Sequence, residues 1–382
     1  MSDVVVVGAG IVGAACAYYA SQAGLSVTVL DRGTVGGGTT SRGEGNILVS
    51  DKGPGPELDL ALRSRTLWLD IGARLGADTI ELEEKGGLVV AKDPEGFAAL
   101  QRFAGYQRES GVSTVPLTGP GLLDREPHLA KDLAGGVFYE DDMQVQPMLA
   151  AAILLAQARA LGVMVESGVT ATGLERDSRG RVTAVVANRR RFPTKAVVNA
   201  AGTWSGDVAQ LFGTTVPVLP RRGFVLVTEP LPRMVRHKVY SADYVSNVAS
   251  SDAGLETSAV IEGTHGGTVL IGASRERVGY SNDMPVEVIR RLAVQAIGLF
   301  PFLEQVALMR VYSGFRPYCP DHLPVIGPDP RVQGIYHACG HEGAGIGLAP
   351  ITGLLIAQLL SGQSPVLDVS PYSPARFDSV TA

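Results

Sequence analysis

The sequence predicts an α/β protein, α+β overall, with one discontinuous domain on a parallel sheet and a second domain on an antiparallel sheet. Three observations support this prediction. The chain starts with a strand, a glycine-rich turn and a helix. From about residue 217 to 280 it changes to β-rich segments separated by polar turns. A buried strand followed by a helix then returns near the C-terminus. The 382 residues, 45% of them apolar, are enough for two hydrophobic cores.

The N-terminal unit is predicted to be a strand, a helix and a second strand. Val4–Val7 is a β-branched run typical of a buried parallel strand. Residues 11–23 follow as a helix that ends at Gly24, and residues 26–30 follow as the second strand. This order is that of a Rossmann-like βαβ unit.

The turn inside this unit reads Gly8-Ala9-Gly10-Ile11-Val12-Gly13, and Asp31 closes the second strand. A glycine fingerprint alone is weak evidence. Here it follows a strand, opens a helix and precedes an acidic residue, as dinucleotide binding requires. Gly8 permits the tight turn, Gly10 lets the backbone approach a pyrophosphate, and Gly13 lets the helix pack on the strand. We expect the helix N-terminus to bind the pyrophosphate and Asp31 to bind the ribose.

A second glycine-rich segment, residues 33–46, decides between the dinucleotides. An NAD enzyme usually continues at this point into an ordinary helix, whereas this chain has a loop of glycines and hydroxyls. Backbone N–H groups and the hydroxyls of Thr39 and Thr40 are suited to bind a pyrophosphate from its other side. The alternative is a flexible surface loop. We interpret the loop as evidence for FAD.

The rest of the chain continues this organisation. Further helices are predicted over residues 56–75, 95–110, 147–161, 285–300 and 345–360. Further strands are predicted over residues 87–91, 163–169, 181–187, 195–201, 223–228, 258–262, 268–273 and 335–338. We therefore assign residues 1–80, 140–215 and 310–382 to a discontinuous FAD-binding domain, and residues 81–139 and 216–309 to a substrate-binding domain.

Charge and composition exclude several classes of protein. The net charge is −5, and the short runs Arg189–Arg191 and Arg221–Arg222 are expected to be solvated turns between strands, so nucleic acid is not an expected partner. No two of the three cysteines have metal-site spacing, and no metal is predicted. No apolar stretch makes a convincing membrane span and the start lacks a basic signal region, so we expect a soluble, cytoplasmic protein.

The chain resembles the D-amino-acid oxidase-like FAD oxidoreductases, which include glycine oxidase, sarcosine oxidase and the β subunits of bacterial opine and D-hydroxyproline dehydrogenases. The resemblance extends nearly end to end and is strongest at residues 3–46, 199–205 and 311–353. The stretch from Ser41 to Lys52 looks most like the D-hydroxyproline and opine dehydrogenase branch.

The resemblance implies cofactor contacts along the whole chain. Ile11 and Val12 would lie on the pyrophosphate, and Asp31 and Arg32 at the adenosine ribose. Val169 would contact adenine through its backbone. The remaining implied cofactor residues are Thr39, Thr40, Arg42, Glu44, Gly45 and Asn46 on the path to the flavin ring, Gly202 in the second glycine turn, and Glu342, Gly343, Ala344, Gly345, Ile346 and Gly347 along the flavin.

Two candidate catalytic residues follow from the C-terminal motifs. In amino-acid-oxidising relatives the arginine of a G-x-R-P stretch, here Arg316, grips the substrate carboxylate, and a guanidinium is a planar, permanently charged match for it. His341 opens the last glycine-rich turn and would lie at the flavin edge. A lone histidine is more often structural, so an acid–base role competes with that interpretation.

Two positions depart from family patterns. Sarcosine-oxidase-like members attach FAD through a cysteine a few residues before the Pro-Asp pair, where this chain has Gly314 and Phe315, so we predict non-covalent FAD and a packed Cys319 thiol. Glycine oxidases carry an arginine where this chain has Gly343, which points to a substrate other than glycine.

The sequence thus predicts oxidation of an amino acid or secondary amine at its C–N bond by hydride transfer to flavin N5. Candidate substrates are a D-amino acid, D-hydroxyproline, an opine or a sarcosine-like amine. The electron acceptor is either O₂ or a partner subunit carrying an iron–sulfur or flavin centre. The alternatives are an FAD-bearing electron-transfer or scaffold subunit without substrate chemistry, and an NAD(P) enzyme, which would not be yellow.

Overall fold

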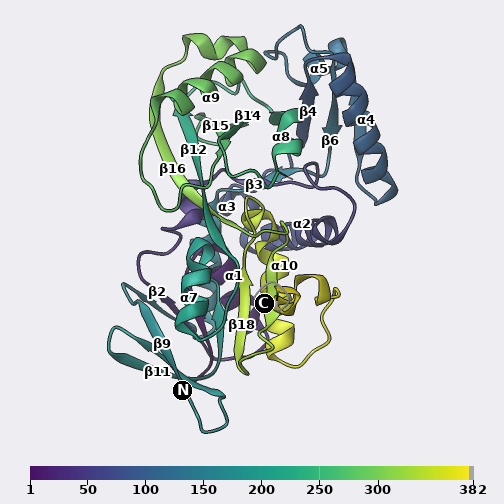
Figure 1. Ribbon diagram of the computed structural model, residues 1–382. Coiled ribbons are helices and arrows are strands. Elements are labelled where there is room, and N and C mark those ends of the chain that lie inside the picture. The colour runs from purple at the N-terminus through teal and green to yellow at the C-terminus, as the bar shows by residue number, and fades with distance from the viewer. Residues whose placement is uncertain (249, 378–382) are drawn as a thin grey trace.

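The computed structural model describes residues 1–248 and 250–377 and has two lobes, each built on one sheet. In Figure 1 the lower lobe carries both termini and the helices α1, α7 and α10, and the upper lobe carries α4, α5, α8 and α9. The chain passes between the lobes several times, so each lobe combines distant parts of the sequence. This confirms the predicted class, a discontinuous Rossmann-like lobe with a second sheet.

The sheet of the lower lobe has the strand order β17-β18-β11-β1-β2-β8, extended by β10 and β9. Strand β1 lies at its centre and pairs in parallel with both β2 and β11. The strand bounds are β1 Ser2–Val7, β2 Val27–Asp31, β8 Met164–Ser167, β9 Ala171–Arg176, β10 Val182–Ala187, β11 Arg190–Asn199, β17 Val325–Pro328 and β18 Ile335–Cys339.

The valine run at the start of the chain is buried because helices and strands cover both faces of this sheet. Val4 and Val6 belong to a core shared with α1, α6 and α10, whereas Val5 and Val7 belong to a core shared with α7 and the β9–β10 hairpin. The helix bounds in this lobe are α1 Ile11–Gln22, α2 Pro56–Leu75, α3 Ala77–Ile80, α6 Pro147–Ala160, α7 Ser205–Leu211 and α10 Gly345–Leu360. Strands β3 Asn46–Ile47 and β7 Met143–Gln144 form a small separate pair.

The sheet of the upper lobe has the order β16-β12-β15-β14-β13-β4-β6-β5. It is antiparallel, as predicted, except where β13 pairs in parallel with β4. Its strands are β4 Gly87–Ala91, β5 Thr114–Leu117, β6 Gly135–Tyr139, β12 Leu219–Thr228, β13 Lys238–Ser241, β14 Glu256–Gly263, β15 Val269–Arg275 and β16 Leu308–Tyr318. Its helices are α4 Pro94–Glu109, α5 Gly119–Arg125, α8 Ala242–Val248 and α9 Val286–Leu299.

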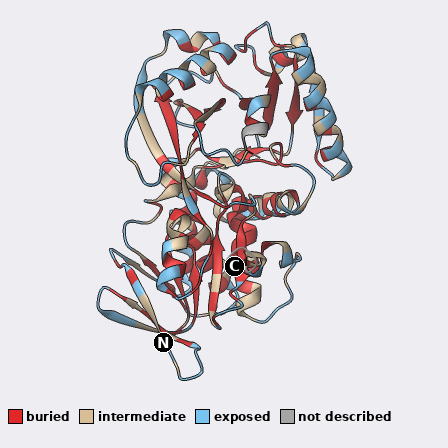
Figure 2. Ribbon diagram, in the orientation of Figure 1, coloured by how far each residue is buried: buried red, intermediate tan, exposed pale blue. Residues whose placement is uncertain are grey.

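Helices α4 and α9 expose their outer faces to solvent, while the strands beneath them are mainly buried (Figure 2). Two strands of this sheet, β12 and β16, are long and reach down between the lobes (Figure 1). Ten register pairs join them, including Arg221 with Arg316 and Gly223 with Gly314. The two strands thereby place side chains of the upper sheet next to the ends of the strands in the lower sheet.

One sequence prediction about this region is wrong. Arg221 and Arg222 do not lie in a solvated turn but inside β12, 1% and 4% exposed. Each has an acidic partner, since Arg221 pairs with Glu256 of β14 and Arg222 pairs with Glu276, which directly follows β15. The sequence gives no sign of partners so distant along the chain, and two adjacent arginines are more often solvated.

No helix of the described residues is long and apolar enough to cross a membrane.

Candidate active site

A cavity of about 570 Å³ lies where the two lobes meet. It extends from the N-terminus of α1, past the loop at residues 33–46, to the facing side of β12 and β16. Its shape is long, because its lining residues range from Val169 at one end to Tyr244 and Arg316 at the other. A dinucleotide is the kind of ligand that matches such an extended cavity at strand ends.

The glycine turn at the start of α1 has the geometry that the fingerprint predicts. Gly8 has a φ of +112°, and a β-carbon there would collide with the backbone of Ala200 on the neighbouring strand's extension. A β-carbon on Gly13 would collide with the Gly8 carbonyl oxygen. Asp31 accepts hydrogen bonds from Ala9 N and Gly33 N, both at 2.7 Å. The carboxylate therefore holds the turn in place and also lines the cavity.

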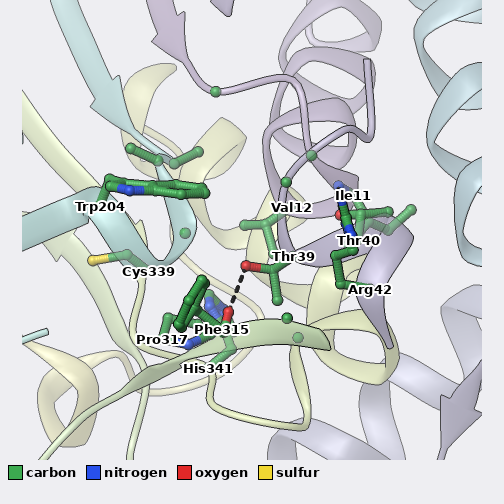
Figure 3. A pocket seen from close by; sticks show the side chains of 18 of the residues that line it. Ile11, Val12, Thr39, Thr40, Arg42, Trp204, Phe315, Pro317, Cys339 and His341 are labelled. Atoms are coloured by element: carbon green, nitrogen blue, oxygen red, sulfur yellow. Dashed lines mark hydrogen bonds between the residues drawn. The ribbon is translucent and has the colours of Figure 1, made fainter. Parts of the chain in front are cut away.

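The two threonines of the second loop hold it against both lobes. Thr40 Oγ1 accepts a hydrogen bond from Ile11 N at 3.0 Å, which satisfies one free N–H of the α1 N-terminus. Thr39 Oγ1 donates to the Phe315 carbonyl of β16 at 2.8 Å, the dashed line in Figure 3. The loop is thus ordered by contacts on both sides, and it forms one wall of the cavity instead of a free surface segment.

Most of the predicted cofactor and catalytic residues line this cavity. They are Gly8, Gly10, Ile11, Val12, Asp31, Arg32, Thr39, Thr40, Arg42, Glu44, Asn46, Val169, Gly202, Arg316, His341, Glu342, Gly343, Gly345 and Ile346. Ala344 and Gly347 line a small adjoining cavity that Asn46 and Gly343 also border. Gly13 and Gly45 lie behind the wall, where each allows a close backbone approach.

Several lining residues were not singled out from the sequence. Trp204 is the largest, and the Arg32 guanidinium lies 4.0 Å from the centre of its ring. Tyr280 stacks on Trp204, with ring centroids 5.9 Å apart. Within residues 199–205 only Gly202 was predicted as a site residue. The tryptophan in the same stretch is the sequence feature that could have indicated this part of the cavity wall. Figure 3 shows Trp204 across the cavity from Val12 and Thr39.

Arg316 lies in β16 at the upper end of the cavity. Its Nη1 donates to the Ser274 carbonyl at 2.8 Å. Gly223, on the neighbouring strand, leaves the room this requires, since a β-carbon there would overlap Arg316 Nη1 and lie 2.5 Å from Ser274 O. Burial, and then the charge of Arg275, lower the pKa of Arg316, which nevertheless keeps its charge at physiological pH. The guanidinium is therefore oriented and poorly hydrated, as a carboxylate site requires.

His341 is placed at the cavity by β18 and the turn into α10. Its Nε2 lies 2.9 Å from Thr352 Oγ1, and that hydroxyl donates to the Leu348 carbonyl at 2.8 Å. The hydroxyl proton is thus used, so the imidazole donates through Nε2–H. Burial lowers the pKa of His341 to about 3. The ring is consequently neutral at physiological pH.

The start of α10 is fixed by donors from α2. Pro350 lies inside α10 and has no N–H, which leaves the Ile346 carbonyl without its helical donor. Trp68 Nε1 supplies one, at 3.2 Å from Ile346 O and 3.1 Å from Gly347 O. Ser64 Oγ also donates to Gly347 O, at 2.6 Å. The helix N-terminus that faces the cavity is therefore held rigidly.

Neither cysteine near the cavity is a reactive thiol. Cys319 is fully buried, as predicted, and burial raises its pKa. Cys339 lines the cavity, and burial raises its pKa to about 12. Both are neutral thiols at physiological pH, which agrees with a cofactor held without a covalent bond.

Comparisons with known proteins identify the family of the chain. Residues 3–359 match the family model described as FAD dependent oxidoreductase, DAO. The chain is 31% identical to glycine oxidase of Geobacillus kaustophilus, covering 98% of this chain and 97% of that one. It is 28% identical to hydrogen cyanide synthase subunit HcnC of Pseudomonas aeruginosa, covering 98% and 96%. The crystal structure of the Geobacillus glycine oxidase superposes with a TM-score of 0.88 at 28% identity, covering 98% of each chain.

The glycine turn, the loop at residues 33–46 and the family match together establish the cofactor and the general activity. FAD is the cofactor, and the enzyme is an oxidoreductase of amino acids or amines. The chain belongs to the DAO family of FAD-dependent oxidoreductases.

Proposed function

We propose that this enzyme oxidises an amine that carries a carboxylate next to the oxidised carbon, removing a hydride from that carbon and leaving an imine that water hydrolyses. The observation that supports this most is Arg316, a half-buried guanidinium that lines the cavity and is oriented by the Ser274 carbonyl. FAD supplies the hydride acceptor when bound. The lower lobe is proposed to hold it within residues 1–80, 140–215 and 310–382, and residues 81–139 and 216–309 to form the substrate-binding domain.

The chain's own residues orient the substrate. Arg316 binds the carboxylate by a charge-assisted pair of hydrogen bonds and so fixes the position of the adjacent carbon. Tyr244 lines the same end of the cavity, and the charge of Arg316 acts on its hydroxyl. Neutral His341 places no positive charge near the substrate, which favours binding of the amine in its neutral, oxidisable form.

The proposed cofactor contacts follow the cavity. The N-terminus of α1 and the loop at residues 33–46 hold the pyrophosphate, Asp31 and Arg32 the adenosine ribose, and Val169 the adenine. The α10 N-terminus, anchored by Trp68, lies toward the flavin and stabilises negative charge on the reduced ring. The neutral thiols support the proposal that FAD is held non-covalently.

The electron acceptor has two candidates, O₂ and a partner subunit. A relative that is named as a subunit of hydrogen cyanide synthase favours it, together with the likeness of residues 41–52 to hydroxyproline and opine dehydrogenases. Purified chain reduced by its amine substrate would then pass electrons to an artificial dye faster than to O₂. Stoichiometric, rapid peroxide formation would instead show that O₂ is the acceptor.

The experiment that tests the proposed function compares Arg316→Gln with the native enzyme. We expect the substitution to lower the second-order rate constant of flavin reduction for amino acids and to leave reduction by an uncharged amine of similar size nearly unchanged. An equal rate constant for carboxylated substrates in both proteins would contradict the role of Arg316. If the chain were instead an FAD-bearing subunit without substrate chemistry, no amine would reduce its flavin.

A further inference from the structure

Two opposite charges that line the cavity, Glu44 and Arg316, are not paired with each other or with another charge. Arg316 donates to the Ser274 carbonyl, and Glu44 accepts a hydrogen bond from Asn46 Nδ2 at 3.2 Å. In the part of the chain that the structure describes, neither of them has an oppositely charged group within the 4.0 Å of an ion pair. Each nevertheless influences the pKa of the other, so the two side chains are near neighbours. A ligand that carries both charges close together would complement them.

The Glu44 carboxylate has more acceptor capacity than the protein uses. The residue is 6% exposed, and a carboxylate offers about four acceptor sites, of which the described residues fill one. Glu44 Oε1 packs against Gly272 of β15, where a β-carbon would lie only 2.3 Å away. Among the described residues, Glu44 Oε1 and Asn46 Oδ1 are both buried without a hydrogen-bond partner. Two neighbouring acceptors at the cavity therefore lack a donor.

The lysine that acts most strongly on Glu44 is already paired. Lys238 forms an ion pair with Glu262, and these two side chains are 1% and 2% exposed. Glu262 also accepts a hydrogen bond from Gly45 N through Oε1, at 3.2 Å. Burial raises the pKa of Glu44, although the charge of Lys238 opposes this increase. A carboxylate in such surroundings is a stronger base than one in water.

The charged and titratable groups around Glu44 come from several elements. They are Lys238 of β13, Tyr244 of α8, Glu262 of β14, and Tyr312 and Arg316 of β16. Strand β15 contributes the backbone of Gly272 and, further along, Arg275, whose charge acts on Arg316. Of these groups, Tyr244 and Arg316 line the cavity together with Glu44.

We propose that Glu44 is a catalytic residue that binds the ammonium group of the substrate, next to the carboxylate held by Arg316, and accepts one proton from it. This inference rests on the proposed function. One N–H bond of the ammonium breaks and one O–H bond forms on the Glu44 carboxylate. The electron pair left on nitrogen then forms the C=N bond as the hydride leaves the carbon for the flavin. An amine that stays protonated has no such electron pair and cannot be oxidised in this way.

The first test measures anaerobic flavin reduction against pH in the native enzyme and in Glu44→Gln. D-Alanine, sarcosine and D-proline serve as a primary, an N-methyl and a cyclic amine. The native second-order rate constant is expected to rise with pH as Glu44 loses its proton, and to level off below the pKa of the free amine. Glu44→Gln has no proton acceptor, so its rate constant should be about 100-fold lower near neutral pH and should keep rising up to the pKa of the free amine.

Glu109→Gln, at an exposed position of α4, controls for the loss of one negative charge and should keep the native profile. The FAD content of each variant shows whether a lower rate comes from lost cofactor. A native pH profile in folded, FAD-containing Glu44→Gln would overturn the inference and leave the proposed function standing. If none of the three amines reduced the native flavin, the proposed function would fail, and this inference with it.

The second test uses the native holoenzyme and needs no turnover. 2-Aminoisobutyrate and 1-aminocyclopropanecarboxylate have no hydrogen on the carbon that would be oxidised, and isobutyrate and cyclopropanecarboxylate are their analogues without the amine. Binding is followed by the flavin spectrum, and proton release by a pH indicator, from mildly acidic to mildly basic pH. Where free Glu44 is protonated, an ammonium ligand and Glu44 retain one shared proton in the complex, so binding should release up to about one proton per site.

The analogues without the amine should release none, because they bring no positive charge to Glu44. The excess release by the amine ligands should be absent in Glu44→Gln and unchanged in Glu109→Gln. Equal proton release by both kinds of ligand at every pH, or amine ligands that bind more weakly than their analogues, would overturn the assignment of Glu44.

Discussion

Arg316 donates a hydrogen bond to the Ser274 carbonyl across 42 residues of sequence, at 2.8 Å. The bond joins β16 to the end of β15 and sets the guanidinium against the cavity. The carbonyl thereby fixes the direction of the proposed carboxylate anchor, and Gly223 on β12 leaves room for the contact. The predictions below follow from this arrangement and from the contacts that hold the cofactor end of the site.

Replacing Arg316 by glutamine should remove the charged anchor for the substrate carboxylate. Hydrogen bonds to charged groups contribute about 1.5–3 kcal/mol, which corresponds to a roughly 10- to 100-fold loss in the rate constant of flavin reduction at low substrate concentration. Stopped-flow reduction with a carboxylated amine measures this loss. Arg310→Gln serves as the control and should behave as the native enzyme.

Gly223→Ala should displace Arg316 without touching the cofactor contacts at the lower lobe. The added β-carbon would overlap Arg316 Nη1 and approach the Ser274 carbonyl, which is backbone and cannot move aside. Overpacking of this kind costs about 1–3 kcal/mol. We expect weaker substrate binding with normal FAD content. Gly173→Ala, where the β-carbon would meet open space, is the matched control. Native substrate affinity in Gly223→Ala would contradict this placement of the guanidinium.

Trp68→Phe should loosen the start of α10. It keeps an aromatic ring but removes the donor to the Ile346 and Gly347 carbonyls, one of which Pro350 leaves without a helical partner. An unsatisfied buried carbonyl costs about 1–3 kcal/mol. The melting temperature should fall, and the FAD dissociation constant should rise. A variant with native values for both would show that the tryptophan only fills space.

His341 should not set the pH dependence of catalysis. Burial lowers its pKa to about 3, so the imidazole is neutral throughout the range from pH 5 to 9 in which the enzyme would be assayed. His341→Gln can still donate a hydrogen bond, and its profile of flavin reduction against pH should show the native inflections at an altered amplitude. Loss of an inflection in the variant would instead identify His341 as a titrating acid or base.

Asp329 should make the protein sensitive to acid. Burial alone would raise the pKa of this carboxyl, but hydrogen bonds from His337, Arg331 and Thr214 more than offset it and hold the pKa well below the usual range. A lowered pKa stabilises the fold above the unfolded value of about 3.9, and this stability is lost as the pH falls further.

Asp329→Asn should therefore unfold more easily than the native protein by about 2–3 kcal/mol near neutral pH, and the difference should shrink below about pH 4. Urea unfolding at several pH values measures it. Asp70→Asn, at an exposed position of α2, controls for the loss of one negative charge. A difference that stays constant with pH would mean that packing, not ionisation, accounts for the effect.

The sequence predicts those parts of the molecule whose signals are local. The strand Gly87–Ala91 and the helices 56–75 and 345–360 have the predicted bounds, because periodicity, proline and glycine mark them within a few residues. The glycine turn and the loop at residues 33–46 could likewise be predicted, because each motif stands between a strand and a helix or strand that the sequence also indicates.

The pairing of Arg221 with Arg316 and the position of Tyr244 at the cavity could not be found in this way. Arg221, Arg275 and Arg316 are neighbours only through the register of β12 with β15 and β16, which no short pattern encodes. The same long-range pairing buries Arg221 and supplies Glu256 as its partner, which is why a solvated turn was the wrong expectation. Trp204 was within a recognised stretch, but its contact with Arg32 depends on the fold.

The most direct test of the central claim is the anaerobic bleaching of the purified yellow protein by a panel of amines. The panel holds D-amino acids, N-methyl amino acids, cyclic imino acids and N-carboxyalkyl amino acids, each beside its α-hydroxy or decarboxylated analogue. The account predicts full bleaching by at least one carboxylated amine and little by either analogue, with the difference from the decarboxylated analogue lost in Arg316→Gln. A flavin that no amine reduces, or that decarboxylated amines reduce as fast, would contradict it.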